Sequence, residues 1–506
     1  MSDGLRTGSG FSFRPALQLM GGRLVGFVAT FFVPVVLVRV FAPEAFGTYK
    51  QLFLIYTTLY GLAQLGMAES LFYFLPLGPE KGARYQVNAL LVLGLSGAAA
   101  LAILWLARDA IAGWLSNPAL APYLPWIGLY LLLMLASAGL EIALLCRRQY
   151  LAATGSYAAS DILRAAVLVA PALFLGELRW LLVGAVAFAA VRLGVHLTVL
   201  WRGYGGERLR PDRSLLREQL GYSMPFQAAV LVEVVQTNLH MYAVSYWFDT
   251  AVFAVYAVGC LQIPLVELAA SSAGNVLMVG MGGALKDGDQ EAAREIWSAT
   301  TRKLALLLVP ATVVLLLAGR DLIPFLFTDT YAAAVPIFLV WTTAIALGAL
   351  QTDAALRTFA EVRFILLMNL ARLAVIAGLI YWAVSGLGLV GAVAVTVLGL
   401  AVAKGLALAR LRRRLDTGWA GVLPWRELGR ICAVSLAAAV PAALLWPGLE
   451  RGAFLTLAVL GTVYAVTLVV LLLAFRVLDD DELATLGRIV RRAVPFWPRP
   501  EPSETR

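Results

Sequence analysis

About fourteen long apolar segments run through this chain, and they constrain its fold more than any other feature. A helix needs roughly 20 apolar residues to cross a bilayer, and each segment approaches or exceeds that length. The expected spans are residues 14–40, 45–75, 85–106, 122–146, 150–175, 179–201, 217–247, 250–283, 296–318, 332–354, 362–384, 387–411, 428–446 and 452–475. With 61% hydrophobic and only 14% charged residues, the chain is too apolar for a soluble domain of its length. We therefore predict an all-α polytopic membrane protein.

The loops between the spans alternate between basic and nearly neutral, which predicts their orientation. Loops after odd-numbered spans mostly hold one Arg beside an acid, whereas loops after even-numbered spans hold clustered cations, such as Arg147 and Arg148. The positive-inside rule places those clusters, and with them both termini, in the cytoplasm. The net charge of +9 is then a topology signal and an attraction to anionic lipid, and we expect no nucleic acid partner.

Two longer basic loops, about 202–216 and 412–427, separate groups of spans. The expected divisions are an N-terminal lobe at 1–205 with spans 1–6, a C-terminal lobe at 206–415 with spans 7–12, spans 13–14 at 416–475, and a tail at 476–506. The tail opens with acids and closes with bases, and its apolar residues fall near one helical face. We expect it to be an amphipathic segment on the cytoplasmic surface.

A weak internal repeat supports the two lobes. Residues 42–49 and 249–256 both place Phe-x-x-Tyr after an acid and an Ala, at the turns between spans 1 and 2 and between spans 7 and 8. Repeated bundles that rock about a central site are a common plan of transporters.

Span 7 carries a polar stripe. Glu233, Gln236, Thr237 and His240 follow one another at i, i+3, i+4 and i+7, so they share one helical face. Ionisable groups are costly in hydrocarbon and usually face a cavity or a partner. The stripe is therefore either a cavity wall or a set of interhelical hydrogen bonds.

Two acids are candidates for ion coupling. Glu267 of span 8 and Glu233 of span 7 both lie near the expected midplane. Buried carboxylates on adjacent helices can share a proton, which would suit proton or cation coupling. The alternative is that either Glu pairs with an Arg.

Cations gather in the expected cytoplasmic half of several spans. The candidates for a cavity are Arg23, Arg164, Arg192 and Arg372. Guanidinium groups bind phosphate oxygens in a bidentate fork, so several Arg facing one cavity would suit a phosphate-bearing ligand. The alternatives are snorkelling to headgroups and pairing with Asp161, Glu141 or Asp353. For Arg164 we expect a local pair with Asp161.

Catalytic motifs do not stand out in the sequence. Cys146, Cys260 and Cys432 lie in different expected spans and no Cys/His cluster occurs, so we expect no disulfide, metal or cofactor. No GxxxxGK[ST] motif for an ATP motor occurs, and both histidines, His196 and His240, are intramembrane. A membrane glycosyltransferase or polymerase is the enzyme alternative, but we would expect it to carry a large outer loop. We predict that the chain is not an enzyme.

Three stretches near the N-terminus carry a recognisable pattern. Residues 39–49 contain acid-x-Phe-Gly-x-Tyr, residues 62–67 contain Leu-x-x-Leu-Gly-Met, and residues 70–76 form an aromatic run. Together they resemble the polysaccharide-biosynthesis flippases of the Wzx (O-antigen) type, in the MOP exporter superfamily with the MATE exporters and lipid II flippases.

The resemblance implies a MOP/MATE-like fold of two six-helix lobes around a V-shaped cavity, with two extra helices. It implies a bacterial inner-membrane flippase that moves an undecaprenyl-pyrophosphate-linked oligosaccharide to the outer leaflet by alternating access. The glycan would serve O-antigen, lipopolysaccharide or exopolysaccharide, and the partners would be this substrate, the bilayer and polysaccharide polymerase machinery. The mid-membrane Glu233 departs from a purely cationic cavity. It leaves a MATE-like, cation-coupled drug antiporter as the alternative.

Overall fold

The computed structural model describes residues 13–77, 79–204, 209–446, 452–479 and 482–483, and these residues form helices and no strand. The predicted all-α fold is confirmed. The helices are α1 (Phe13–Val40), α2 (Pro43–Ala63), α3 (Met67–Leu77), α4 (Gly82–Leu106), α5 (Arg108–Trp114), α6 (Leu124–Ala136), α7 (Leu140–Cys146), α8 (Tyr150–Leu175), α9 (Leu178–Gly203), α10 (Arg213–Trp247), α11 (Thr250–Gly259), α12 (Pro264–Lys286), α13 (Gln290–Phe327), α14 (Val335–Leu347), α15 (Thr352–Thr358), α16 (Val362–Arg414), α17 (Trp425–Leu445) and α18 (Ala453–Ala474). Short 3₁₀ turns lie at η1 (Pro79–Lys81), η2 (Pro118–Leu120) and η3 (Asp329–Ala334).

Ten helical segments of the described chain are long and apolar enough to cross a membrane. The expected count of fourteen spans therefore stays a prediction. One of the ten, α16, covers two expected spans, because it reverses at Gly388, whose φ of 58° is in the left-handed region that favours Gly. Glu361 at the start of α16 accepts a hydrogen bond of 2.8 Å from Arg410 near its end, so the two arms lie antiparallel.

Four of the expected spans are interrupted helices. The pairs are α2 and α3, α6 and α7, α11 and α12, and α14 and α15. Local sequence explains two interruptions: Gly66 has a φ of 64° between α2 and α3, and Pro264, which lacks an N–H, begins α12. The interruptions fall in the second and fourth spans of each expected lobe, which adds a structural repeat to the weak sequence repeat. Discontinuous helices commonly form the binding sites of transporters.

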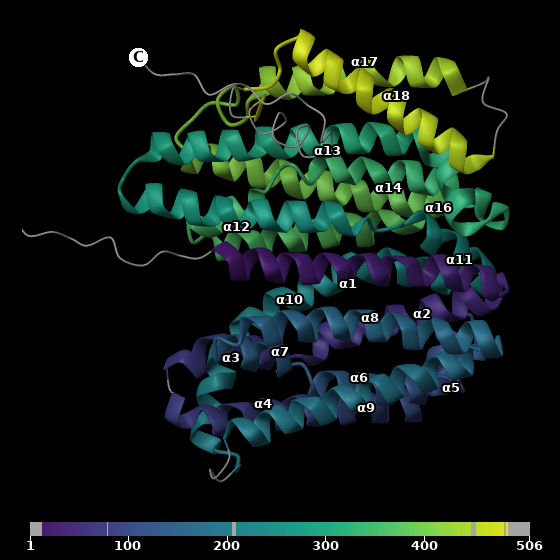
Figure 1. Ribbon diagram of the computed structural model, residues 1–506, viewed down its shortest axis with the longest axis vertical. Helices are drawn as coiled ribbons and strands as arrows, with labels where there is room; N and C mark the ends of the chain where they lie inside the picture. The colour runs from purple at the N-terminus through teal and green to yellow at the C-terminus, as the bar shows by residue number, and fades with distance from the viewer. Residues whose placement is uncertain (1–12, 78, 205–208, 447–451, 480–481, 484–506) are drawn as a thin grey trace, which may run out of the picture.

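The helices run roughly parallel to one another in Figure 1. We call residues 13–204 the first half and residues 209–414 the second half. Helices α4, α6, α8 and α9 lie together at the bottom of the view, α12, α13, α14 and α16 lie above the middle, and α17 and α18 pack on α13 at the top. This packing supports the predicted division into two lobes and two added helices, which remains a prediction.

Basic connections share one end of the bundle. The α3–α4, α9–α10 and α12–α13 connections all lie at the end where α1 begins, on the left in Figure 1. We call this the inner end and the opposite one the outer end, after the predicted orientation.

The beginning of the acidic tail is docked on α13. Arg302 of α13, whose side chain is only 10% exposed, binds Asp479 at 2.5 Å and Glu482 at 2.8 Å. It also donates to the carbonyl oxygen of Val477 at 2.6 Å. The contact fastens the chain that follows α18 to the second half. The predicted amphipathic helix beyond residue 483 lies outside the described residues.

We expect the Arg302 cluster to contribute to stability. Glu482→Gln removes one of two carboxylates from a buried guanidinium, so we expect a loss of about 1–3 kcal/mol in the free energy of unfolding. Thermal unfolding of the purified protein in detergent measures this. The control is Glu291→Gln, in an exposed pair with Arg294 at 3.2 Å, where the cost should stay below about 1 kcal/mol. Equal losses in the two variants would contradict the role of the docked tail.

Candidate functional site

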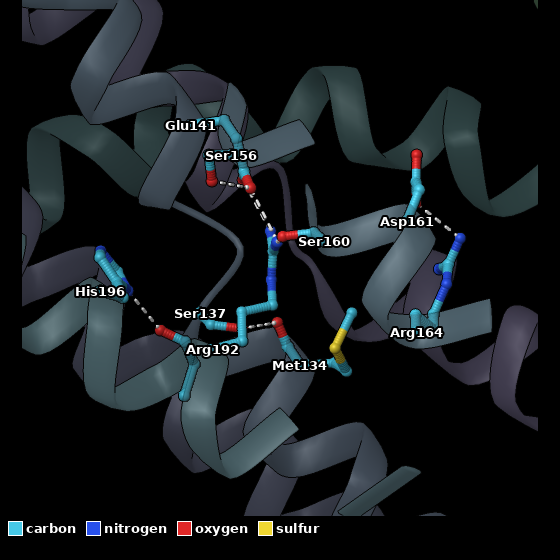
Figure 2. Close-up of polar contacts among 10 residues, drawn as sticks. Met134, Ser137, Glu141, Ser156, Ser160, Asp161, Arg164, Arg192 and His196 are labelled. Carbon is cyan, nitrogen blue, oxygen red and sulfur yellow. Dashed lines mark hydrogen bonds and ion pairs between the residues drawn. The ribbon is translucent and has the colours of Figure 1, made fainter. Parts of the chain in front are cut away.

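The interruption between α6 and α7 places a carboxylate inside the first half. Glu141 lies in the first turn of α7, and Arg192 of α9 donates Nη1 to its Oε1 at 2.7 Å and Nη2 to its Oε2 at 2.6 Å (Figure 2). From α8, Ser156 donates to Glu141 at 3.1 Å, and Ser160 accepts from Arg192 at 2.8 Å. The Arg192 and Glu141 side chains are 12% and 3% exposed. This buried, bidentate pair joins three helices and already uses most of the donors of Arg192.

Arg164 is also paired within the first half. It donates to Asp161 at 2.8 Å, as the sequence predicted, and to the hydroxyl of Thr30 on α1 at 3.3 Å. A Cβ on Gly26 would lie 2.2 Å from Asp161 Oδ2, so α1 and α8 pack closely here. Arg23 belongs to α1, but its side chain lies outside the described residues, so its role stays a prediction.

His196 forms a hydrogen bond with a backbone carbonyl at the end of α6, beside the interruption between α6 and α7. Its Nδ1 lies 3.0 Å from the carbonyl oxygen of Ala136, the last residue of α6. A carbonyl can only accept, so Nδ1 is the donor. Figure 2 shows His196 beside the Glu141–Arg192 pair. Its position is that of a structural partner, because backbone groups in hydrocarbon need internal hydrogen bonds.

The interruption between α14 and α15 organises a second polar cluster, in the second half. Lys404 of α16 donates to the hydroxyl of Thr352, the first residue of α15, at 3.2 Å. Asp353 follows, and Arg372 lies on the other arm of α16; all but the buried Thr352 are half-buried. The charges of Asp353 and Glu233 act on Arg372, but neither forms an ion pair with it within the described chain. Arg372 and Lys404 thus form fewer ion pairs and hydrogen bonds than Arg164 and Arg192 of the first half.

The polar stripe of span 7 divides between two environments. Gln236 and His240 are each 2% exposed, whereas Glu233 and Thr237 are exposed. Gln236 donates to Asn369 at 3.3 Å, and His240 Nδ1 lies 2.7 Å from the Tyr256 hydroxyl. The buried members hold the second half together, as the hydrogen-bonding alternative expected. This argues against a cavity-lining role for His240.

Glu233 and Glu267, the two candidate coupling acids, lie on helices that are not in close contact in this structure. Both side chains are exposed, and α10 and α12 do not pack closely against each other over the described residues. The reason is that span 8 is interrupted: α12 begins at Pro264, which leaves Glu267 in its first turn. The charge of Glu233 acts on Arg372 of α16. A coupling role for Glu233 and Glu267 stays a prediction.

The repeated turns of the two halves meet at the outer end. A Cβ on Gly47 would lie 2.2 Å from the carbonyl oxygen of Thr250, so α2 and α11 touch there through backbone. Beside this contact, buried Gln51 donates to Ser245 at 2.7 Å and accepts from Asn117 at 2.6 Å. The outer end is closed by these contacts between halves.

The start of α10 is fastened to the first half at the inner end. Asp212 caps α10, and its backbone N–H and C=O both bond the Asn88 amide of α4 at 3.0 Å. Arg84 pairs with its carboxylate at 3.2 Å. Hydrogen bonds from the Ser214 hydroxyl and the Leu215 N–H lower the pKa of Asp212, so it stays ionised as a cap.

Lys404 is the site residue that sequence reasoning missed. It is a cation inside the apolar stretch 387–411, farther from the end of the stretch than Arg410, and intramembrane charges are functional candidates by default. That signal was available. The contact between Lys404 and Thr352, 52 positions earlier, could not be predicted from the sequence, because it depends on the reversal of α16.

Comparison with known proteins decides the family. The profile of the polysaccharide biosynthesis protein family matches residues 36–336. The chain belongs to this family. Its family and fold are those of transporters and flippases, not of enzymes. No curated protein sequence matches the chain.

Several solved structures have a fold similar to that of this chain. A lipid II flippase MurJ in an inward closed conformation superposes with a TM-score of 0.73 at 13% identity, covering 92% of this chain and 99% of that one. An inward-facing multidrug resistance MATE family transporter of the MOP superfamily gives 0.56 at 17% identity, covering 77% and 94%. The Vibrio cholerae MATE transporter VcmN in its bent form gives 0.53 at 14% identity, covering 80% and 96%. The predicted MOP/MATE-like fold is therefore confirmed.

We expect the Arg192–Glu141 pair to act as a unit. Arg192→Met leaves a buried carboxylate without its cation, which should cost about 3–5 kcal/mol of stability. Adding Glu141→Gln removes the unpaired charge and should restore most of that loss. Thermal unfolding of the single and double variants in detergent tests the coupling. If the double variant is no more stable than Arg192→Met, the pair is not the cause.

We expect Gly47→Ala to open the outer end. The added Cβ meets the backbone of Thr250, so the closed arrangement should lose about 1–3 kcal/mol. Labelling of Ser245→Cys with a membrane-impermeant maleimide, without the native cysteines, should increase. Gly113→Ala at the same end is the control, since nothing lies within 4 Å of its Cβ position. Unchanged labelling in Gly47→Ala would contradict the closure contact.

Proposed function

We propose that this protein flips a polyprenyl-pyrophosphate-linked oligosaccharide from the inner to the outer leaflet of the bacterial inner membrane. It would work by alternating access, with both termini in the cytoplasm, and would serve surface polysaccharide synthesis such as O-antigen or exopolysaccharide. The observation that carries the proposal is the match to the polysaccharide biosynthesis family over residues 36–336. The likeness in fold to a lipid II flippase supports it.

Interior charge gives the proposal a chemical basis. Cations lie inside both halves, at Arg164, Arg192, Arg372 and Lys404. A diphosphate is the anionic group of a polyprenyl-pyrophosphate carrier, and guanidinium and ammonium groups bind phosphate oxygens. The lipid tail would remain in the bilayer while the headgroup and sugars pass between the halves.

Contacts at the two ends support alternating access. The halves meet at the outer end through Gly47 and Thr250, and α10 is fastened to α4 at the inner end. Packed interfaces of this kind have discrete arrangements, so a rocking motion would open one end at a time. A polysaccharide polymerase would be the partner that receives the exported unit.

Deletion of the gene tests this function directly. We expect lipid-linked repeat units to accumulate facing the cytoplasm, because no other step moves their headgroups across the hydrocarbon. Surface polysaccharide should fall, and a plasmid-borne copy should restore it. Mass spectrometry of extracted lipid-linked sugars measures the accumulation. Normal surface polysaccharide in the deletion strain would rule the proposal out.

A cation-coupled exporter of small drugs is the second candidate. The observation that favours it is exposed Glu233 on α10, with the charge of Arg372 nearby, in a chain with a MATE-like fold. Glu233, with Glu267 as the second candidate carboxylate, would then carry the coupling ion. Resistance to cationic dyes should depend on the protein and fall with Glu233→Gln. Equal resistance in cells with and without the protein would reject this candidate.

A further inference from the structure

The two halves contain the same polar arrangement at equivalent positions. Glu141 is the second residue of α7, and Asp353 is the second residue of α15, each directly after the interruption of its span. The cation opposite Glu141 is Arg192, 51 positions later, and Lys404 follows Asp353 by the same 51 positions. The same spacing therefore places an acid directly after the interruption of the fourth span and a cation 51 positions later in each half.

In the first half the acid and the cation of this site bind each other. Both terminal nitrogens of Arg192 donate hydrogen bonds to the two oxygens of Glu141, and Arg192 also donates to Ser160. The side chains of Arg192 and Glu141 are 12% and 3% exposed, so the pair is largely buried. A phosphate could take the two terminal nitrogens of Arg192 in a fork only by displacing Glu141, which would leave a buried carboxylate unpaired.

Besides the shorter acid, the site of the second half differs from that of the first at two positions. Lys404, an ammonium on a flexible stem, bonds the Thr352 hydroxyl at 3.2 Å and forms no ion pair with Asp353 within the described chain. Arg372 follows Asp353 by 19 positions, as Ser160 follows Glu141. A hydrogen-bonding hydroxyl of the first half is thus replaced by a second cation.

The donors of these two cations are largely unused. No hydrogen bond of Arg372 occurs among the described residues, and its Nε is buried without a partner. Arg carries five N–H donors and Lys three. Asp353 and Glu233 balance their charge at longer range, but they do not occupy these donors.

We propose that Arg372 and Lys404 bind the diphosphate of the transported lipid, whereas Arg192 is a structural residue. Two neighbouring cations, one a planar fork and one a mobile point charge, match two linked phosphates. This inference rests on the proposed function, and it assigns the anionic headgroup to the second half of the protein.

Binding measurements on the full chain test the assignment. Purified protein in phosphatidylcholine nanodiscs is titrated with undecaprenyl diphosphate, with undecaprenol and with inorganic diphosphate. Arg372→Gln and Lys404→Gln should each weaken binding of undecaprenyl diphosphate by about tenfold or more, and Lys404→Arg should retain most of it. Binding of undecaprenol should be the same in all variants, because it lacks the diphosphate.

Arg363→Gln is the matched control. It removes the same charge from the exposed start of the same helix and should leave binding unchanged. Wild-type binding in Arg372→Gln and Lys404→Gln, or an equal loss in Arg363→Gln, would overturn the assignment. Inorganic diphosphate that binds as tightly as the lipid would also overturn it, since the site would then serve a free anion. An unchanged unfolding temperature and size-exclusion profile distinguish lost binding from misfolding.

The outcomes separate this inference from the proposed function. If the deletion strain accumulates lipid-linked units but Arg372→Gln and Lys404→Gln bind the diphosphate normally, the function stands and the assignment is wrong. If the variants lose binding but the deletion strain has normal surface polysaccharide, the diphosphate site stands and the proposed function is wrong.

Discussion

Hydrocarbon cannot hydrogen-bond backbone, and the interior of this protein depends on that constraint. A continuous helix satisfies its own N–H and C=O groups, so each interrupted span must find other partners. His196 supplies one of them, at Ala136, and each helix that follows an interruption carries an acid in its first turn. The four interruptions thus determine where polar side chains can be gathered inside an otherwise apolar bundle. The two acid-and-cation sites lie at the interruptions of α6–α7 and α14–α15 for this reason.

The same architecture gives the halves different chemistry. In the first half, Arg192 and Glu141 form a bidentate ion pair, and Ser156 and Ser160 bond to it. These contacts hold α7, α8 and α9 together. In the second half, Lys and Arg replace the Arg and Ser, and the acid is the shorter Asp, so cations remain that are not consumed by partners. This division of charge is compatible with the proposed rocking mechanism, in which repeated bundles move as rigid bodies around a central site.

Closure at the outer end depends on backbone contact between the repeated turns. Gly47 permits the carbonyl of Thr250 to approach where any side chain would intrude. Across the seam the buried Gln51 amide donates to the Ser245 hydroxyl, and Asn117 of the first half donates in turn to Gln51. Polar groups of this kind can exchange partners when the halves separate, whereas an interdigitated apolar seam would resist opening. The sequence motif around Gly47 is therefore a feature that resembles the family and is also a contact between the two halves.

Hydropathy and loop charge determined the all-α membrane fold and the ends of most helices, because about 20 apolar residues and an Arg cluster are local signals; α8 coincides with the predicted span 150–175. The local Arg164–Asp161 pair was predictable for the same reason, since three residues separate its members. Contacts between distant segments were not: Lys404 reaches Thr352 only because α16 reverses at Gly388, and Gln236 and His240 face inward while Glu233 does not. Sequence spacing identifies a helical face, but only the packing of neighbouring helices decides whether that face meets a cavity, a partner or lipid. Tertiary structure therefore decided which of the intramembrane charges form ion pairs and which have no ion-pair partner in the described chain.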